Sequence, residues 1–198
     1  MQILDVSQLV ELYAKGERNF PGISLVNANL IEAQLAEISL PGACLSGSNL
    51  SAANLYRINW VEADLTKAIL WRSVLQNAYG VKVNLSQAIL IKANLNGADL
   101  HGANLTKADL RLADLRNTDL SGANLSGADL RYANLSNANL VGADLSNCNL
   151  TGTNLNQADL WNSKLDKAIV SRTNLCDANF SKIEISDIEA LFVDLVKA

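Results

Sequence analysis

The 198-residue sequence has few of the residues from which catalytic, metal and disulfide sites are built. It contains one histidine, two prolines and three cysteines, and aromatic residues make up only 5% of the chain. A single histidine cannot supply a multi-imidazole metal site. An odd number of widely spaced cysteines does not form a disulfide framework, so we expect reduced thiols, as in a cytoplasmic protein.

Long apolar runs and a strong charge imbalance are also missing. No run reaches the length of a transmembrane helix, and the first residues lack the basic and apolar regions of a signal peptide. The formal net charge of −4 is mild for this size, so composition does not favour direct nucleic-acid binding. We therefore expect a cytoplasmic protein without a membrane partner.

A five-residue repeat occupies most of the chain. With a Leu-type residue as the centre of each unit, 33 centres follow one another from Leu25 to Ile185 without insertion or deletion, and 28 are Leu. Two residues before the centre, the small position is Ala in 21 units; one residue before it, the polar position is Asn or Asp in 22. The two residues after the centre are the first and second variable positions. A period of five is neither helical nor that of a flat strand, so the repeat predicts a solenoid.

This pattern, over residues 18–185, resembles the pentapeptide repeat family. The resemblance implies one all-β solenoid domain, a right-handed quadrilateral β-helix with four units per coil. The centre and the small position are expected to point inward and the other three positions outward. Coils at the usual strand spacing of about 4.8 Å would give about eight coils and a rod roughly 40 Å long. The segment 13–20 is similar to cyanobacterial members of the family, one of which regulates heterocyst differentiation.

Both ends of the solenoid are predicted to carry a helical cap, because an open end exposes core and unpaired strand edges. In residues 1–17, an apolar stripe at helical spacing starts near Asp5 or Ser7 and ends at Gly16. Residues 186–198 open on a Ser-x-x-Glu capping box before a second apolar stripe. This second helix covers the last coil or, as in gyrase-inhibiting members of the family, pairs two chains; a monomer is favoured.

Two unusual centres, Trp60 and Gly80, are twenty residues apart and therefore neighbours inside the tube. An indole in a Leu-sized position overfills the core, and a glycine in the next coil leaves space for it. We predict that the two compensate each other, with the indole leaning over Gly80. A ligand pocket at Gly80 is the alternative.

Apolar residues gather at outward positions of the same region. Isoleucine replaces Asn or Asp at two polar positions twenty residues apart, and Trp and Ile stand at the first variable positions that follow. An apolar patch with a charged rim is typical of a protein-binding site. The predicted partner-binding residues are Ile69, Trp71, Arg72, Ile89, Ile91 and Lys92. The alternatives are that these β-branched residues only suit a sheet face, or that the N-terminal helix covers them.

A basic stripe is predicted to continue along the same face. Its residues are Arg111, Arg131, Tyr132 and Arg172. Stacked like charges repel, so such a stripe can bind an anionic partner. However, an aspartate two residues before each of the first two arginines can neutralise it, and a solvated mixed-charge face is the favoured interpretation.

The only histidine, His101, is predicted to project on the same side as Asp99. No second histidine, nucleophile or thiolate cluster accompanies this pair, and a flat solenoid wall offers no pocket, so neither catalysis nor metal binding is expected there. The periodic Asn and Asp residues are expected to serve the turns and the solvent rather than a carboxylate site.

Three classes of function follow for this sequence. The first is a non-catalytic scaffold or regulator that binds an unknown protein partner through the apolar patch. The second, implied by the resemblance to the quinolone-resistance branch of the family, is a DNA mimic that binds a type II topoisomerase through acidic residues such as Asp99, Asp119 and Asp159. The third is an enzyme, which no residue constellation supports. We expect no cofactor and no metal.

Overall fold

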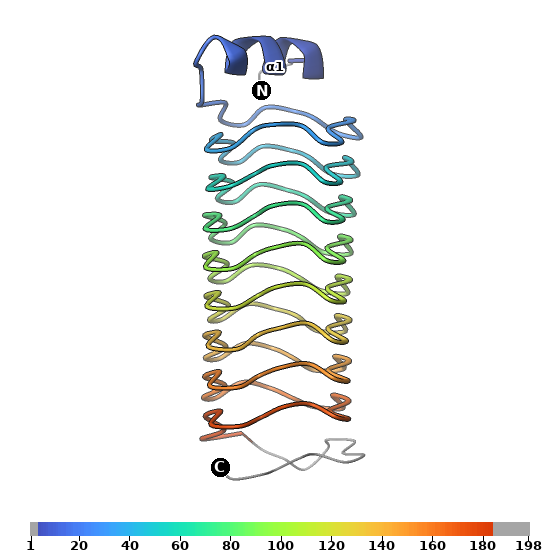
Figure 1. Ribbon diagram of the computed structural model, residues 1–198, viewed down its shortest axis with the longest axis vertical. Helices are drawn as coiled ribbons and strands as arrows, with labels where there is room; N and C mark the ends of the chain where they lie inside the picture. The colour runs from blue at the N-terminus through green and yellow to red at the C-terminus, as the bar shows by residue number, and fades with distance from the viewer. Residues whose placement is uncertain (1–3, 184–198) are drawn as a thin grey trace.

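The computed structural model describes residues 4–183, which form one helix followed by a four-sided tube (Figure 1). After the helix, each repeat contributes a single bridged residue rather than a long strand. Each polar position forms a parallel bridge with the residue twenty positions later, in an unbroken series from Asn19↔Ser39 to Asp159↔Asn179. One coil therefore takes twenty residues, or four repeats, and each repeat occupies one face of the tube.

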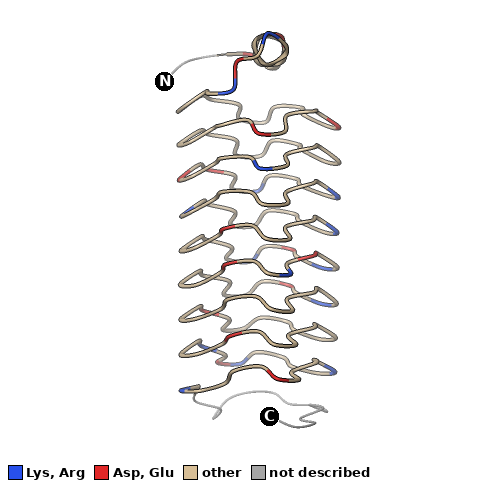
Figure 2. Ribbon diagram, turned by 60° about the vertical axis from the view of Figure 1, so that its left-hand side comes forward, with Lys and Arg blue, Asp and Glu red and all other residues tan. Residues whose placement is uncertain are grey.

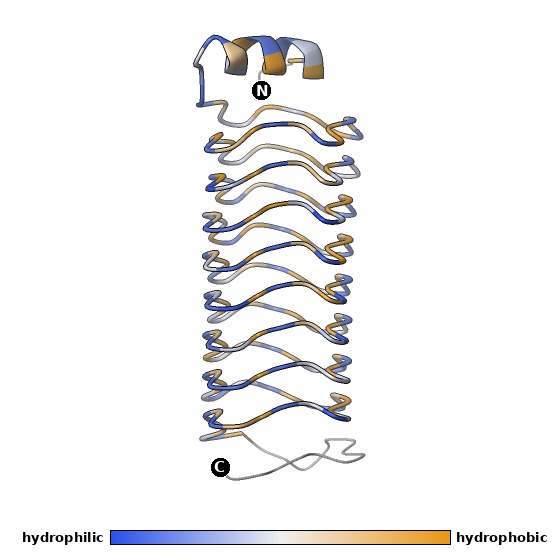
Figure 3. Ribbon diagram, in the orientation of Figure 1, coloured by the Kyte–Doolittle hydropathy of each residue, from blue (hydrophilic) through white to orange (hydrophobic). Residues whose placement is uncertain are grey.

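The core is a continuous column inside the tube. All centres from 20 to 175 are buried, and so are the small positions from 38 to 178. Hydropathy alternates along every coil for this reason (Figure 3). The prediction that the centre and the small position point inward is confirmed.

Backbone hydrogen bonds join each repeat to both neighbouring coils. In the repeat centred on Leu105, the centre and the second variable position donate their N–H groups to carbonyls of the next coil. The polar position of the following repeat donates to the preceding coil, and the small position donates across the turn to the centre. These four N···O distances are 2.7–3.0 Å. Four of the five N–H groups of a repeat are thus satisfied by backbone carbonyls.

The fifth N–H group explains the Asn and Asp at the polar position. In the 22 repeats centred from 30 to 180 that have Asn or Asp, the side-chain Oδ1 accepts the N–H of the first variable position, two residues later, at 2.9–3.3 Å. This is the Asx-turn bond, which fixes the chain as it leaves the face. The prediction that these residues serve the turns is confirmed.

The turn imposes a separate demand on the second variable position. Every such position from 22 to 182 has a left-handed backbone, with φ between +54° and +71°. Glycine fills nine of these positions, and no Val, Ile or Thr occupies any of them. β-Branched residues are strongly disfavoured at positive φ, whereas Gly and Asn accept it. The backbone therefore restricts a position whose side chain is free to face solvent.

Inside the tube, Trp60 and Gly80 form the compensating pair that the sequence predicts. Trp60 is completely buried. A Cβ atom on Gly80 would lie 2.2 Å from Nε1 and 2.7 Å from Cδ1 of the indole, so the ring occupies the space that a side chain at position 80 would need. The indole N–H has no acceptor among the residues described. The space beside Gly80 is filled by the indole.

The predicted N-terminal helix is present as α1, Val6–Ala14, and lies across the first coil (Figure 1). Asp5 caps it by accepting the N–H of Gln8, whose side chain in turn accepts the N–H of Asp5. Leu9 is fully buried, and the Tyr13 hydroxyl donates to the Ala36 carbonyl at 2.8 Å. No helix in residues 4–183 is long and apolar enough to span a membrane. The C-terminal helix predicted for 186–198 lies outside the described residues.

Candidate functional site: an apolar patch on one face

The predicted patch lies on the Leu70 face, the side of the tube built from repeats centred on 30, 50, 70, 90, 110, 130, 150 and 170. Ile69 and Ile89 pair directly through a parallel bridge. Ile89 and Trp71 are 37% and 40% exposed, while Ile69 and Ile91 are half-buried. The structure brings the four apolar side chains together on two adjacent coils, and we call them the Ile69–Ile91 patch.

The N-terminal helix does not cover this patch. Its contacts are with the first coil: Leu9 belongs to the core cluster there, and Tyr13 binds Ala36. Figure 1 shows α1 at the end of the tube, beyond the coils that carry the patch. The alternative in which α1 covers the Ile69–Ile91 patch is therefore wrong.

At the patch, the Asx-turn bond is given up. Isoleucine has no acceptor, so the N–H groups of Trp71 and Ile91 have no hydrogen-bond partner among the described residues. Val74 and Tyr79, in the same coil, likewise replace Asn or Asp. The ladder of Asx turns is thus interrupted where large apolar side chains become exposed.

Cations border the patch at two corners of the tube. The Arg72 guanidinium lies 4.8 Å from the centroid of the Trp71 ring, within the range of a cation–π contact. Lys92 is stacked one coil further, and Lys67 and Lys107 lie at the corner before the Leu70 face. None of these four cations has a carboxylate within 4.0 Å in the part of the chain described.

The predicted basic stripe is largely neutralised. Arg111 binds Asp109 through two nitrogens at 2.7 and 2.8 Å, and Arg131 binds Asp129 in the same way at 2.6 and 2.9 Å. These bonds raise the pKa of both arginines. Burial alone would raise the pKa of Asp129, but the hydrogen bonds and charge of Arg131 lower it overall. The favoured mixed-charge interpretation agrees with this geometry.

The other two residues of the stripe occupy a different column. Tyr132 and Arg172 stand at second variable positions, so Arg172 is not stacked in register with Arg131. Tyr132 is 58% exposed, and its ring lies over Gly152, where a Cβ atom would come within 2.6 Å of it. Leu112, one coil earlier in this column and 50% exposed, was missed in the sequence analysis. A leucine at a second variable position is the signal that could have revealed it.

The side chains of Asp99 and His101 have different hydrogen-bond partners. Asp99 accepts the backbone N–H of His101 in an Asx turn, while the imidazole Nδ1 lies 2.9 Å from the Ser121 hydroxyl. No group of three or more metal-ligating side chains occurs in residues 4–183. The imidazole is thus part of an ordinary surface hydrogen bond.

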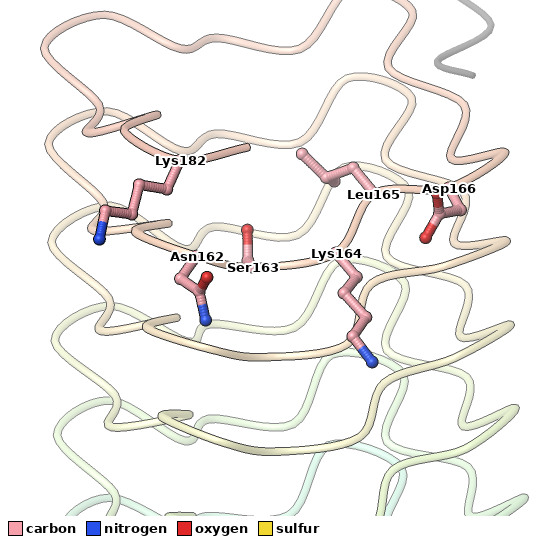
Figure 4. A pocket seen from close by; sticks show the side chains of 6 residues that line it. All are labelled: Asn162, Ser163, Lys164, Leu165, Asp166 and Lys182. Carbon is pink, nitrogen blue, oxygen red and sulfur yellow. The ribbon is translucent and has the colours of Figure 1, made fainter. Parts of the chain in front are cut away.

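One hollow lies near the C-terminal end of the described tube (Figure 4). Its lining residues are Asn162, Ser163, Lys164, Leu165, Asp166 and Lys182. In Figure 4 the amino groups of the two lysines point in different directions, away from Ser163. The hollow therefore gathers no nucleophile with a base and no convergent set of charges.

Charge is balanced along the tube. Residues 19–183 contain 13 acidic and 13 basic side chains, so the net charge of −4 comes from the two terminal segments. Both signs are scattered over the coils, without a continuous acidic face (Figure 2). Other cations of the described tube, such as Lys82, Lys164 and Arg172, also have no carboxylate within 4.0 Å. The cations around the Ile69–Ile91 patch are therefore notable for their position beside exposed apolar side chains.

Comparison with known proteins identifies the repeat. The chain matches the family described as pentapeptide repeats over 17–47, 43–79, 81–117, 108–147 and 143–181. Among curated proteins no significant match was found.

Three solved structures are similar to the chain. HetL from the cyanobacterium Nostoc sp. strain PCC 7120, described as involved in heterocyst differentiation regulation, is 36% identical, with 93% of this chain and 96% of HetL covered and a TM-score of 0.40. Rfr23 from the cyanobacterium Cyanothece 51142 is 33% identical over 51% of this chain and 60% of its own, with a TM-score of 0.35. QnrB1, a plasmid-mediated fluoroquinolone resistance protein, is 18% identical over 93% and 90% of the two chains, with a TM-score of 0.51.

Proposed function

Because the chain belongs to the pentapeptide repeat family, whose members form right-handed quadrilateral β-helices, we propose that it is a non-catalytic protein-binding scaffold or regulator. The proposed site is the Ile69–Ile91 patch together with Arg72 and Lys92. The rigid tube holds these outward side chains at fixed spacing, so little conformational entropy is lost when a partner binds.

The observation that carries this proposal is the break in the Asx ladder. At 22 polar positions, Asn or Asp satisfies a backbone N–H, a bond worth about 0.5–1.5 kcal/mol. Ile69 and Ile89 forgo it and expose apolar surface instead. The lost hydrogen bond and the exposed apolar surface both make the isolated tube less stable in water. We therefore expect these isoleucines to serve binding to another molecule. Trp71 also has the character of an interface hot spot, being a large aromatic side chain beside an arginine.

A regulatory partner is part of the proposal. HetL, to which the chain is 36% identical over nearly its full length, is described as involved in heterocyst differentiation regulation. The sequence identity supports a role of the same general kind, and the partner itself is not transferred from fold resemblance.

The second candidate is a DNA mimic that binds a type II topoisomerase. The support for this candidate is the similarity in fold to QnrB1, which is described as a fluoroquinolone resistance protein. Such a mimic would depend on acidic residues such as Asp99, Asp119 and Asp159. A tube with equal numbers of acidic and basic side chains offers little of the negative field that a DNA mimic needs.

The remaining features of the proposal concern the whole molecule. We take α1 as a cap that shields the first coil, the segment 186–198 as a second cap, and the tube as about eight coils. The protein is proposed to act as a cytoplasmic monomer without cofactor, metal, membrane partner or direct nucleic-acid contact. Pairing of two chains through 186–198 would instead double the mass measured in solution.

Affinity capture from an extract of the native host, read by mass spectrometry, tests the proposal. The baits are the wild type and a Trp71→Glu, Ile89→Lys variant, which places charges in the patch. A matched control, Val81→Glu with Val141→Lys, makes the same charge changes at first variable positions of another face. We expect a protein that the wild type and the control retain and that the patch variant loses.

The other outcomes separate the candidates. Equal recovery by all three baits would contradict binding through the Ile69–Ile91 patch. A topoisomerase retained by all three, with recovery falling steeply as salt rises, would favour the DNA mimic, because exposed charge interactions are screened by salt.

A further inference from the structure

The cations at the border of the Ile69–Ile91 patch differ from most arginines of the tube. Four arginines outside the patch have carboxylate partners within the chain; they are Arg57, Arg111, Arg116 and Arg131. Lys67, Arg72 and Lys92 have none within 4.0 Å in the described chain, although all three are exposed. The patch therefore combines apolar surface with positive charge that the chain leaves uncompensated.

The backbone beside the patch adds two hydrogen-bond donors. In the regular repeats, the N–H of the first variable position is reached by an Asn or Asp side chain on the outer surface, so this N–H faces outward. At Trp71 and Ile91 the same N–H has no acceptor within the described residues. The surface thus offers apolar contacts, three cations and two backbone donors that have no acceptor within the described residues.

Building on the proposed function, we propose that the patch recognises an acidic amphipathic segment of its partner protein. Apolar side chains of that segment would pack on Trp71 and Ile89. Its carboxylates would face Lys67, Arg72 and Lys92 and supply acceptors of the kind that Asn and Asp supply elsewhere in the ladder. Uncompensated charge at the border of an apolar patch mainly determines which partner binds and how fast it associates.

A nucleic acid is a less suitable occupant, although it is also anionic. The patch has one aromatic ring, Trp71, for base stacking, and isoleucine side chains have no groups that read base edges. Three cations on two corners are few against the phosphate contacts that sustain nucleic-acid binding, and the tube as a whole is neutral. An acidic peptide matches both the apolar and the charged part of the surface.

Selection from a library of random 12-residue peptides tests the inference directly. The bait is the full chain, and the Ile69→Asn, Ile89→Asn variant removes peptides that bind elsewhere. We expect the enriched peptides to carry a net negative charge and at least one large apolar residue. Enrichment of neutral or basic peptides would overturn the inference and leave binding through the patch intact.

The best enriched peptide then serves as a defined probe in affinity measurements. The Lys67→Glu, Arg72→Glu, Lys92→Glu variant should bind it at least about tenfold more weakly, which corresponds to roughly 1.4 kcal/mol. In the matched variant Lys82→Glu, Lys164→Glu, Lys167→Glu, the first two lysines lie away from the patch corners and Lys167 lies five coils beyond Lys67 on the same corner. This variant should bind within about twofold of wild type, because distant charges are screened beyond about 10 Å at 0.1 M salt. Equal losses in both variants would contradict recognition by the local cations.

Three further outcomes have definite meanings. Patch-dependent binding of a labelled single-stranded oligonucleotide, in place of the peptide, would overturn the inference. If no peptide is enriched while host-extract capture still depends on the patch, only the inference fails. If capture is also independent of the patch, the proposed function fails with it.

Discussion

The regular repeats, residues 93–160, and the irregular repeats, residues 21–92, form the same tube. They differ in the side chains at the core and at the polar positions. In the regular part, every polar position is Asn or Asp and accepts its Asx-turn bond. In the irregular part, an indole fills the core beside a glycine, and isoleucines interrupt the ladder outside. The backbone geometry is the same in both, because the register never slips.

The two kinds of irregularity teach different things. The inner one is compensated within the fold, since Gly80 leaves the space that Trp60 takes. The outer one has no compensation among the described residues, since the N–H groups of Trp71 and Ile91 find no acceptor there. An unusual core residue that a neighbour accommodates needs only a packing explanation. An unusual surface residue that costs a hydrogen bond without any gain inside the fold points to a function such as binding.

The largest expected effect is at Gly80. Gly80→Ala places a Cβ atom 2.2 Å from the indole Nε1, so the ring must shift inside a closed core. We expect a loss of about 3 kcal/mol in the free energy of unfolding, at the upper end of overpacking costs. Denaturant unfolding measures this loss. The comparison is Gly142→Ala in the regular part, because no atom lies within 4 Å of a Cβ atom at that position.

A double-mutant cycle sharpens this result. Trp60→Leu alone should cost about 2 kcal/mol through the void it leaves. Adding Gly80→Ala to that variant should cost almost nothing, because the void accepts the methyl group. If the two losses simply add, the indole is not packed against Gly80.

The next effect concerns the left-handed turn position, which both regions share. Gly142 has φ +66° and nothing within 4 Å of its would-be Cβ atom, so only backbone strain distinguishes the substitutions. Gly142→Val should destabilise the protein by about 1–2 kcal/mol more than Gly142→Asn. Equal melting temperatures for the two variants would contradict the assigned turn geometry.

A smaller effect compares polar positions of the two regions. Asn104 accepts the N–H and the hydroxyl of Thr106 and donates to Asn84. Asn104→Ala should cost about 1 kcal/mol, because these bonds are partly replaced by water. Ile89→Ala removes no such bond and should cost clearly less. A larger loss for Ile89→Ala than for Asn104→Ala, in parallel urea titrations, would mean that the Asx ladder does not stabilise the tube.

The smallest effect is electrostatic and depends on pH. The hydrogen bond from Arg116 lowers the pKa of Asp114 below its usual value. The folded state therefore gains stability from this pair above about pH 3.9, the unfolded pKa, and loses it as pH falls through the lowered value. Arg116→Gln should lower the free energy of unfolding slightly at pH 7, as urea titrations would measure, and should have no effect once Asp114 is protonated. Arg72→Gln should show no such pH dependence, because Arg72 has no carboxylate within 4.0 Å in residues 4–183.

Much of this architecture could be predicted from the sequence because one strict register governs it. The centres, the small positions and the pairing of Trp60 with Gly80 all follow from counting in units of five and twenty residues. The helix at 6–14 followed from its apolar spacing, with Asp5 as the residue that caps it. The patch residues were likewise brought onto adjacent coils by the twenty-residue spacing.

The rest depends on atoms that a spacing argument does not describe. The Asx-turn bond explains why the polar position prefers Asn and Asp, but a side-chain acceptor for a particular N–H is visible only in three dimensions. The predicted basic stripe joins Arg172 to Arg131, although Arg172 stands one position further along its turn and therefore lies in the column of Tyr132. The exposure of Leu112 depends on the left-handed turn, which the repeat pattern alone did not reveal.

The most direct test of the central claim is the Ile69→Asn, Ile89→Asn variant, used as bait beside wild type in host-extract capture. The change restores an acceptor to both interrupted repeats and removes apolar surface, so the free energy of unfolding should stay within about 1 kcal/mol of wild type. We predict that this well-folded variant loses the partner that the wild type retains. Retention of the same partner by both baits would contradict the claim that the interrupted ladder marks the binding surface.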